Sequence, residues 1–188
     1  IYFLGIGGIG MSAIARYFMR EGAKVAGYDR TETALTRSLA EEGAQVHYDD
    51  DPALIPAAFR DPADTLVIYT PALPDDHAES VWFREHGFRI LKRSQTLGLL
   101  SSNKYVRAVA GTHGKTTTTS MAAWFIHVAG GGGRAFPGGI SKTFGSECVL
   151  GHRNRPAVEA DEFDLSFLLL YPGRAVFTLS HDYPPVIY

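Results

Sequence analysis

A glycine-rich run near the start of the chain has the residue types and spacing of a nucleotide-binding turn. Gly5-Ile6-Gly7-Gly8-Ile9-Gly10 follows a short apolar segment and precedes a segment with helical periodicity. In this pattern the first glycine permits a tight turn, the second lets the backbone approach a diphosphate, and the third lets the helix pack closely on the strand. Asp29 ends the next apolar segment, where a carboxylate can accept a ribose hydroxyl. The run predicts a diphosphate-nucleotide site; a glycine turn needed only for packing is the alternative.

A second run, Gly111-Thr112-His113-Gly114-Lys115-Thr116-Thr117, ends in the Gly-Lys-Thr of a phosphate-binding loop. In such loops backbone N–H groups surround the phosphates, the lysine reaches the terminal ones and the threonine hydroxyl binds Mg²⁺. The run departs from the G-x-x-x-x-G-K-[ST] spacing, because position 109 is Val. It predicts an ATP site; a helix start capped by threonine, with a solvated lysine, is the alternative.

Two phosphate loops in one chain favour a particular kind of enzyme. A simple dehydrogenase has no use for the second loop, whereas an enzyme that holds a nucleotide-linked substrate and consumes ATP elsewhere needs both. The acidic segment 159–164, which begins at Glu159, adds oxygen ligands of the kind that Mg²⁺ takes. A solvated acidic turn is the alternative for that segment.

Alternating strand and helix patterns position the first loop. We expect strands over residues 1–4, 24–28, 45–48, 65–69 and 88–91, and helices over residues 12–21, 33–42 and 75–86. This alternation is typical of a parallel sheet with helices on both faces. It predicts an α/β, Rossmann-like domain.

The pattern restarts after residues 101–103, which gives expected domains of residues 1–102 and 103–188. In the second domain we expect a strand over 105–110, a helix over 116–128, strands over 157–160 and 175–179, and a short helix over 166–170. This is the first part of a P-loop α/β ATP-binding domain. Trp82 and Trp124 fall on apolar helix faces, which predicts that both belong to the core.

The composition of the 188 residues excludes several classes of protein. Lys and Arg number 18 against 20 Asp and Glu, so there is no basic excess for a nucleic acid or a membrane surface. No apolar run approaches the ~18 residues of a membrane span. The single Cys148 excludes an internal disulfide framework and, with no signal-peptide pattern, favours a cytoplasmic protein.

Taken together, the motifs resemble the Mur ligase family. The matching segments run in order along nearly the whole chain: Tyr2–Ala13, Gly27–Asp29, Val67–Ala72, Ala110–Thr119, Gly138–Lys142 and Val158–Asp164. The loop that contains His113 is specific for this type of ligase, and the resemblance accounts for the Val at position 109.

The resemblance implies an ATP-dependent ligase whose three domains bind a UDP-sugar, ATP and the incoming amino acid. The type that it resembles most joins L-alanine to the lactyl carboxylate of UDP-N-acetylmuramate through an acyl phosphate, in peptidoglycan synthesis. The residues implied for the UDP-sugar are Gly5, Gly7, Gly8, Ile9, Gly10, Asp29, Thr70 and Pro71. Those implied for ATP are Gly111, Thr112, His113, Gly114, Lys115, Thr116 and Thr117, with Lys115 and His113 catalytic and Thr116 and Glu159 binding Mg²⁺.

The sequence departs from the family in two respects. The family histidine that binds a second Mg²⁺ falls on Pro184, and we hypothesise that His181 with Asp182 replaces it. The rest of the ATP domain and the C-terminal domain are absent, so we expect this chain to be inactive alone. Three alternatives stay open: a ligase that recycles murein tripeptide, an NAD(P)-dependent oxidoreductase, and a non-catalytic UDP-sugar-binding fragment. The segment 5–12 favours the alanine ligase over the tripeptide ligase.

Overall fold

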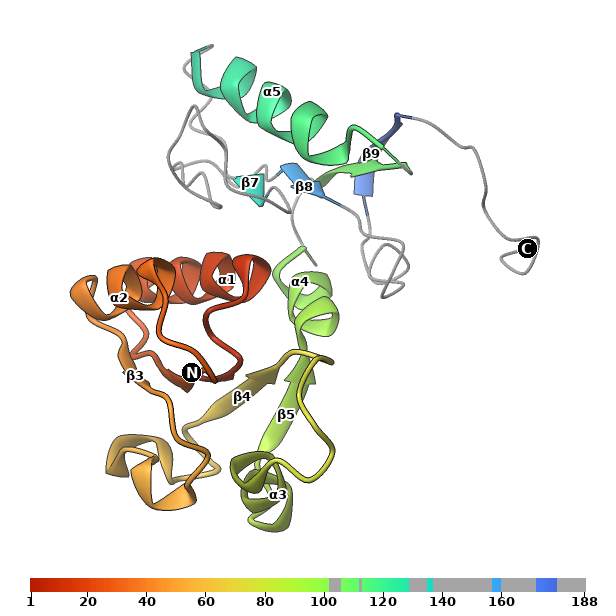
Figure 1. The fold of residues 1–188 in the computed structure, drawn as a ribbon. Helices are drawn as coiled ribbons and strands as arrows, with labels where there is room; N and C mark the ends of the chain where they lie inside the picture. The colour runs from red at the N-terminus through yellow and green to blue at the C-terminus, as the bar shows by residue number, and fades with distance from the viewer. Residues whose placement is uncertain (102–105, 112, 129–134, 137–156, 160–171, 179–188) are drawn as a thin grey trace. The chain divides into compact units, whose positions relative to one another are not determined.

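The computed structural model describes residues 1–101, 106–111, 113–128, 135–136, 157–159 and 172–178 (Figure 1). Contacts divide the chain into two units, residues 1–96 and 97–188, and each unit is described by itself. Several sequence expectations lie outside the described residues: Thr112, the acidic residues after Glu159, the helix over 166–170, and the segment with His181 and Pro184.

A five-stranded parallel sheet forms the first unit, in the order β3-β2-β1-β4-β5. The strands are β1 (Tyr2–Leu4), β2 (Ala26–Tyr28), β3 (Gln45–His47), β4 (Leu66–Tyr69) and β5 (Arg89–Lys92). Leu4 pairs with Tyr28 on one side and Tyr69 on the other. The strands that follow β1 in the chain therefore lie on both sides of it. The parallel sheet expected from the sequence is confirmed; β1 to β4 are shorter than expected and β5 is shifted by one residue.

Helices cover the two faces of this sheet. They are α1 (Ile9–Arg20), α2 (Ala34–Glu41), α3 (Ala78–Glu85) and α4 (Arg93–Ser101), with short 3₁₀ helices η1 (Pro52–Leu54) and η2 (Ala57–Phe59). Helices α1 and α2 lie on one face, and α3 lies on the other with η1 and η2 (Figure 1). The sequence analysis missed α4 and both 3₁₀ helices. None of the helices in the described part of the chain has the length and apolarity to cross a membrane.

Capping side chains determine where two of these helices begin. Thr33 precedes α2, where its hydroxyl accepts the N–H of Thr36 at 3.2 Å while its own N–H donates to the Thr36 hydroxyl at 2.9 Å. This reciprocal pair satisfies two amides at the helix start. His77 caps α3 and accepts the N–H of Ser80. The helix expected over 75–86 therefore begins only at Ala78.

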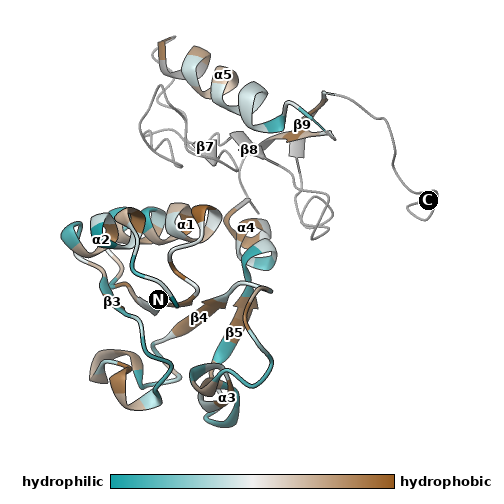
Figure 2. Cartoon of the chain, in the orientation of Figure 1, coloured by the Kyte–Doolittle hydropathy of each residue, from teal (hydrophilic) through white to brown (hydrophobic). Residues whose placement is uncertain are grey.

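One hydrophobic core cluster of the first unit lies between the sheet and α3, η1 and η2. It consists of Tyr2, Leu4, Ala26, Tyr28, Ile55, Phe59, Val67, Phe83 and Phe88. Figure 2 shows the hydrophobic residues along β4 and in the middle of β5 that pack in this sheet. Each fully buried large apolar side chain contributes roughly 1.5–3 kcal/mol relative to an exposed one. The core therefore fixes the strand ends from which the first loop leaves.

A four-stranded parallel sheet forms the described part of the second unit, in the order β7-β8-β6-β9. Its elements are β6 (Val106–Ala110), α5 (Lys115–Val128), β7 (Ala135–Phe136), β8 (Ala157–Glu159) and β9 (Pro172–Phe177). The strand, loop and helix expected around the second glycine-containing run are confirmed.

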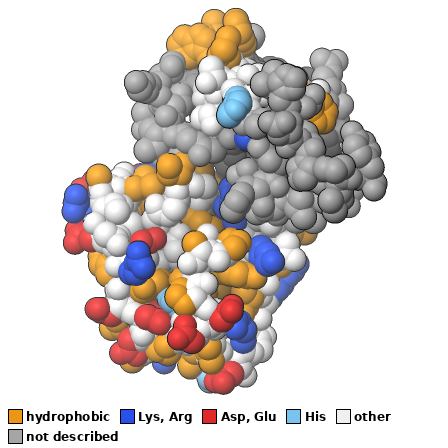
Figure 3. Space-filling model, turned by 45° about the vertical axis from the view of Figure 1, so that its right-hand side comes forward, with side chains coloured by type: hydrophobic (Ala, Val, Ile, Leu, Met, Phe, Trp, Pro, Cys, Tyr) orange, Lys and Arg blue, Asp and Glu red, His pale blue; other side chains and the backbone are white. Residues whose placement is uncertain are grey.

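The core position expected for Trp124 is wrong. Its side chain is 45% exposed on α5, next to Met121 at 54% and Phe125 at 67%. Hydrophobic side chains gather at the top of the view in Figure 3, where α5 lies. Helical periodicity identifies an apolar face, but it does not say whether another element covers that face. Trp82, in contrast, packs against the core of the first unit as expected.

Candidate functional site

The first glycine-rich run connects the end of β1 to α1 and is held by the end of β2. The N–H groups of Gly5 and Ile6 both donate to the carbonyl of Tyr28, at 2.8 and 3.0 Å. Gly5 has a φ of +86°, and a Cβ there would lie 2.5 Å from Cγ2 of Thr70. A side chain at this position would be strained and would clash with the residue that follows β4. The turn therefore requires glycine.

Gly7 lies against the carboxylate of Asp29. Its N–H donates to Oδ2 of Asp29 at 2.7 Å, and the other oxygen, Oδ1, accepts the N–H of Thr31 at 3.2 Å. A Cβ on Gly7 would lie 2.8 Å from Oδ2 of Asp29 and 2.7 Å from Cγ2 of Thr36. Asp29 thus holds the loop in place, a role that the spacing of the motif did not reveal.

The role expected for the third glycine needs correction. A Cβ at Gly10 would lie 2.6 Å from a terminal guanidinium nitrogen of Arg93, at the start of α4. The close neighbour of Gly10 is therefore the Arg93 side chain rather than the strand. The sequence could not reveal this contact, because α4 was not expected.

The start of α1 provides backbone donors beside the loop. Gly8 precedes the helix without a side-chain cap, and the first turn carries no acidic residue. Ser12 donates the first i→i−4 bond, to the carbonyl of Gly8 at 2.8 Å. Helix geometry leaves the N–H groups of Ile9 and Gly10 without an intrahelical acceptor. Together with the helix dipole, these amides favour an anion.

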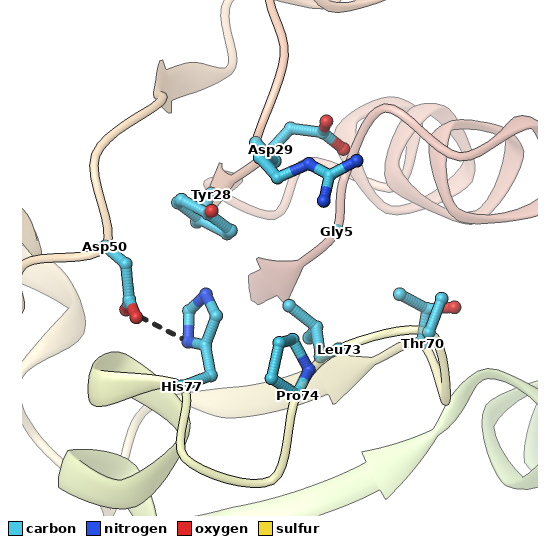
Figure 4. A pocket seen from close by; sticks show the side chains of 10 residues that line it. Gly5, Tyr28, Asp29, Asp50, Thr70, Leu73, Pro74 and His77 are labelled. Carbon is cyan, nitrogen blue, oxygen red and sulfur yellow. Dashed lines mark ion pairs between the residues drawn. The ribbon is translucent and has the colours of Figure 1, made fainter.

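A pocket of about 340 Å³ lies at the carboxyl ends of the strands beside this loop (Figure 4). Its lining residues are Gly5, Tyr28, Asp29, Arg30, Asp50, Thr70, Ala72, Leu73, Pro74 and His77. Strand order reverses at β1, which has β2 on one side and β4 on the other. Ligands of open α/β sheets bind at such a switch point, outside the carboxyl ends of the strands. The pocket is therefore the candidate ligand site of the first unit.

The pocket includes some of the residues expected for the UDP-sugar and not others. Gly5, Asp29 and Thr70 line it. Gly7, Gly8, Ile9 and Gly10 lie in the adjoining loop and helix start, and Pro71 is exposed beside Thr70. The sequence analysis missed the lining residues Tyr28, Arg30, Asp50 and His77. Tyr28, Arg30 and Asp50 had a signal, because they lie at the ends of β2 and β3 or within three residues of them, and parallel strands bring these ends to one edge. His77 had none, since it lies at the start of α3, eight residues after β4.

The carboxylates of this pocket are already held by donors. Oδ2 of Asp50 accepts the N–H of Ala78 at 2.8 Å and Oδ1 that of Glu79 at 3.0 Å, so Asp50 binds the start of α3. Nδ1 of His77 lies 3.1 Å from Oδ1 of Asp50, as Figure 4 shows. Burial lowers the pKa of His77, although Asp50 opposes this shift. Arg30 is then the positively charged lining residue available to an anionic ligand.

The second run forms the loop between β6 and α5. Gly114 has a φ of +79°, and Lys115 and Thr116 begin the helix. Nζ of Lys115 donates to the carbonyl of Gly111 at 2.7 Å, so the ammonium group points back over the loop. Thr117 is exposed in the first turn. The described residues thus place a lysine, a glycine turn and a helix N-terminus together, and these three groups favour anions such as phosphate.

Thr178, which the sequence analysis did not single out, holds this loop from the end of β9. Its N–H donates to the carbonyl of Ala110 at 3.0 Å, and its hydroxyl donates to the carbonyl of His113. The His113 side chain is exposed. Thr178 therefore fixes the loop backbone at Ala110 and His113, which precede Lys115 in the sequence.

Strand register brings Glu159 to the same edge of the sheet as this loop. Glu159 ends β8 and pairs with Val109 of β6, the strand that leads into the loop. A carboxylate at a strand end beside a phosphate loop is a common Mg²⁺ position. Within the described residues, no group of three or more His, Cys, Asp or Glu side chains forms a metal site.

Comparison with known proteins identifies the family. Residues 1–105 match the sequence profile described as Mur ligase family, catalytic domain. This chain belongs to the Mur ligase family. The resemblance noted from the motifs is thereby confirmed, and the match includes the first loop and every residue that lines the pocket.

Its relatives include enzymes described as UDP-N-acetylmuramate–L-alanine ligases. The Mur ligase from Phocaeicola vulgatus is 54% identical over 179 residues, and that from Parabacteroides distasonis is 49% identical. Each alignment covers 95% of this chain and 39% of the relative. The chain therefore spans about two fifths of the length of these curated relatives.

Solved Mur ligase structures have the same fold. The UDP-N-acetylmuramate:L-alanyl-gamma-D-glutamyl-meso-diaminopimelate ligase of Neisseria meningitides superposes with a TM-score of 0.85 at 25% identity, covering 100% of this chain and 62% of that one. The UDP-N-acetylmuramate-alanine ligase of Thermotoga maritima gives 0.80 at 31% identity, covering 96% and 41%. The Rossmann-like α/β fold class is confirmed.

Proposed function

We propose that this chain is the UDP-sugar-binding domain and part of the ATP-binding domain of a ligase that joins L-alanine to UDP-N-acetylmuramate. The observation that carries the proposal is the 54% identity to an L-alanine ligase over 95% of the chain. The two loops, each at the carboxyl edge of a parallel sheet, support it independently. We assign residues 1–102 to the UDP-sugar and residues 103–188 to ATP.

The first unit binds the UDP part of the substrate in this proposal. The free N–H groups of Ile9 and Gly10 and the guanidinium of Arg30 face the negative charge of the diphosphate, while Gly5 and Gly7 allow the backbone to come close. Asp29 keeps the loop in this shape through its bond with Gly7. The pocket of about 340 Å³ beside the loop is of a size to hold part of a nucleotide.

The second unit binds ATP. Lys115 leaves its internal bond with Gly111 for the phosphates, and the amides at the start of α5, from Gly114 to Thr117, surround them. The hydroxyl of Thr116 and the carboxylate of Glu159 are the hard oxygen donors that Mg²⁺ takes, and the bound ion would neutralise phosphate charge. His113, exposed at the loop, is assigned as a contact to the reacting groups.

The chemistry follows from the weakness of a carboxylate as an acyl donor. In the proposed reaction the γ-phosphoryl group passes from ATP to a lactyl carboxylate oxygen, releasing ADP. The amine of L-alanine then attacks the acyl carbon, the carbon–oxygen bond to phosphate breaks, and the amine loses a proton. Lys115 and the loop amides hold the transferring phosphoryl group and offset its charge, because catalysis of this step rests on positioning and electrostatics.

Two other functions compete with this one. A tripeptide-recycling ligase is favoured by the high TM-score to the Neisseria meningitides protein, but that protein is only 25% identical. An NAD(P)-dependent oxidoreductase was suggested by the first loop and Asp29. Membership of the Mur ligase family and the second phosphate loop argue against it.

A thermal-shift titration tests the proposal, because a ligand that binds only the native state raises the apparent stability. UDP-N-acetylmuramate and ATP with Mg²⁺ are each expected to raise the melting temperature of the chain, and NAD(H) is not. Stabilisation by NAD(H) without stabilisation by UDP-N-acetylmuramate would overturn the assignment. We also expect no alanine-dependent phosphate release from this chain alone; turnover comparable to that of a full-length ligase would contradict the assigned domain content.

A further inference from the structure

A buried cluster of three titratable side chains lies behind the pocket and has no part in the function proposed above. Tyr2 of β1 and Glu79 of α3 are fully buried, and the side chain of His47 at the end of β3 is 16% exposed. The Tyr2 hydroxyl lies 2.7 Å from Oε2 of Glu79 and 2.7 Å from Nε2 of His47. One hydroxyl thus joins residues that are 45 and 77 positions away in the sequence.

The contacts of this cluster determine how many protons it holds. Nδ1 of His47 lies 3.0 Å from the carbonyl of Asp49, which can only accept, so Nδ1 carries a hydrogen. In a neutral His47, Nε2 is then an acceptor and takes the single hydrogen of Tyr2. The Tyr2 oxygen in turn faces Oε2 of Glu79 as an acceptor. That contact needs a hydrogen from Glu79, so the carboxyl group is protonated.

An ionised arrangement satisfies the same contacts with the same number of protons. There His47 is a cation, Glu79 is a carboxylate, and Tyr2 donates to Oε2. In both arrangements the three side chains share one proton beyond those of a neutral imidazole, a carboxylate and a phenol. Removal of that proton leaves one of the 2.7 Å contacts with no hydrogen between two acceptors. The geometry therefore requires the shared proton.

The cluster is connected to the wall of the pocket. The N–H of Glu79 donates to Oδ1 of Asp50 at 3.0 Å, and His77, two residues before Glu79, lies 3.1 Å from the same oxygen. Asp50 itself comes three residues after His47. Tyr2 thus ties together the two segments, 47–50 and 77–79, that supply the pocket-lining pair Asp50 and His77 (Figure 4).

We propose that Tyr2, His47 and Glu79 are positioning residues, and that their shared proton keeps Asp50 and His77 in the geometry that the UDP ligand of the pocket needs. This inference rests on the proposed UDP-binding function of the first unit. It predicts that UDP affinity falls when the cluster loses its proton, although none of the three side chains lines the pocket.

The charged groups around the cluster support a proton held at neutral pH. Burial raises the pKa of Glu79 to about 8, and the Asp50 and Asp51 carboxylates add to the rise while the Tyr2 hydrogen bond opposes it. Burial lowers the pKa of His47, against the opposing effect of Asp49 and the carboxylates of Asp50 and Asp51.

The third member of the cluster, Tyr2, keeps its hydroxyl hydrogen at neutral and moderately alkaline pH. Burial and the nearby Glu79 and Asp50 raise the pKa of Tyr2 far above its ordinary value, and Arg60 opposes that rise. The neutral arrangement, with the proton on Glu79, is therefore the one expected near pH 7. Oε1 of Glu79 lies 3.2 Å from Nε2 of His47 without a hydrogen bond, a separation that also accommodates the ionised arrangement.

The test is calorimetric titration of the 188-residue chain with UDP at about pH 7 and about pH 9, for wild type and E79Q. A glutamine amide can donate to the Tyr2 oxygen as the protonated acid does, but it cannot lose that hydrogen. Wild-type affinity is expected to fall by up to about tenfold more than that of E79Q between the two pH values. Ionisation of UDP itself affects both proteins equally and cancels in this comparison.

A second variant separates the cluster from general loss of structure. Y2F removes the hydroxyl that joins the two segments, and it is expected to weaken UDP binding at both pH values. Tyr48→Phe, which removes a hydroxyl bonded to Thr36 instead, is the control and keeps the wild-type pH dependence. Circular dichroism verifies that each variant is folded.

The outcomes separate this inference from the proposed function. A wild-type pH dependence matched by E79Q, or UDP affinity unchanged in folded Y2F, overturns the positioning role alone. Failure of UDP to bind wild type and E79Q at either pH overturns UDP binding by the first unit, and the positioning role with it. Rescue of high-pH binding by E79Q supports both.

Discussion

The N–H of Gly7 donates to Oδ2 of Asp29 at 2.7 Å, across 22 positions of sequence. This bond ties the glycine-rich loop after β1 to the residue that follows β2. A Cβ on Gly7 would meet the same carboxylate, so the absence of a side chain is what permits the bond. The acidic residue of the motif therefore shapes the loop, in addition to any contact with a ligand.

Removal of the Asp29 carboxylate is expected to weaken ligand binding through the loop. D29A leaves the Gly7 amide without its acceptor, at a cost of about 1–3 kcal/mol. We expect a smaller melting-temperature increase with UDP than in wild type. D29N is the matched control, because its amide oxygen can still accept from Gly7. Equal UDP responses in D29A and wild type would contradict the role assigned to the bond.

Neighbouring glycines of the loop are expected to differ in their tolerance of alanine. G7A places a methyl group 2.7 Å from Cγ2 of Thr36 and 2.8 Å from Oδ2 of Asp29, so it is expected to destabilise the fold by about 1–3 kcal/mol. At Gly8 the nearest atom to a Cβ is 3.6 Å away, which is ordinary contact. Urea unfolding of the two variants measures the difference, and a G8A cost as large as that of G7A would refute the steric explanation.

Lys115 is expected to control ATP binding without affecting the first unit. K115A removes the ammonium group beside the second loop and is expected to weaken binding of a fluorescent ATP analogue by about tenfold or more. Lys92, exposed at the end of β5, provides the control variant K92A. UDP-induced stabilisation is expected to persist in both. Unchanged ATP-analogue binding in K115A would show that the loop is only a helix start.

The buried carboxyl group of Glu79 is expected to make stability depend on pH. Its pKa is raised from the ordinary 4.5 to about 8 by burial, so the folded state binds more protons than the unfolded state between these values. The unfolding free energy therefore falls as pH rises from about 4.5 through about 8, by up to a few kcal/mol. Urea unfolding across this range measures it. In E79Q this component is expected to vanish, and an identical slope in both proteins would contradict it.

Much of the fold could be predicted because its signals are local. The runs around Leu66–Tyr69 and Val106–Ala110 are apolar, apart from Arg107, and end at turn residues, so their identity as strands needs no knowledge of partners. The glycine-rich run and the Gly-Lys-Thr run each form a turn between a strand and the next helix, and residues close in the sequence determine such turns. Helix α4 was missed because its residues have no strong apolar periodicity, and contacts rather than pattern determine it.

The candidate site was predicted less completely. Asp50 and His77 were not singled out, because neither belongs to a recognised motif: Asp50 lies in a run of three aspartates and His77 stands alone in the sequence. Parallel pairing of β1, β2 and β4 brings their ends together, and the bond from Asp50 to the start of α3 brings His77 beside them. Such a site is formed by strand order, which single-sequence patterns do not encode.

The sequence by itself determined most of the strands and helices, the two glycine-containing loops and the family resemblance, because each depends on residues that are close in the chain. Only the tertiary structure decided that Asp29 holds Gly7, that Arg93 lies against Gly10, and that Tyr2 joins His47 to Glu79. These contacts join residues 22 to 83 positions apart. They form only when strands pair and helices pack on the sheet, because these steps bring atoms that are distant in the sequence within bonding distance.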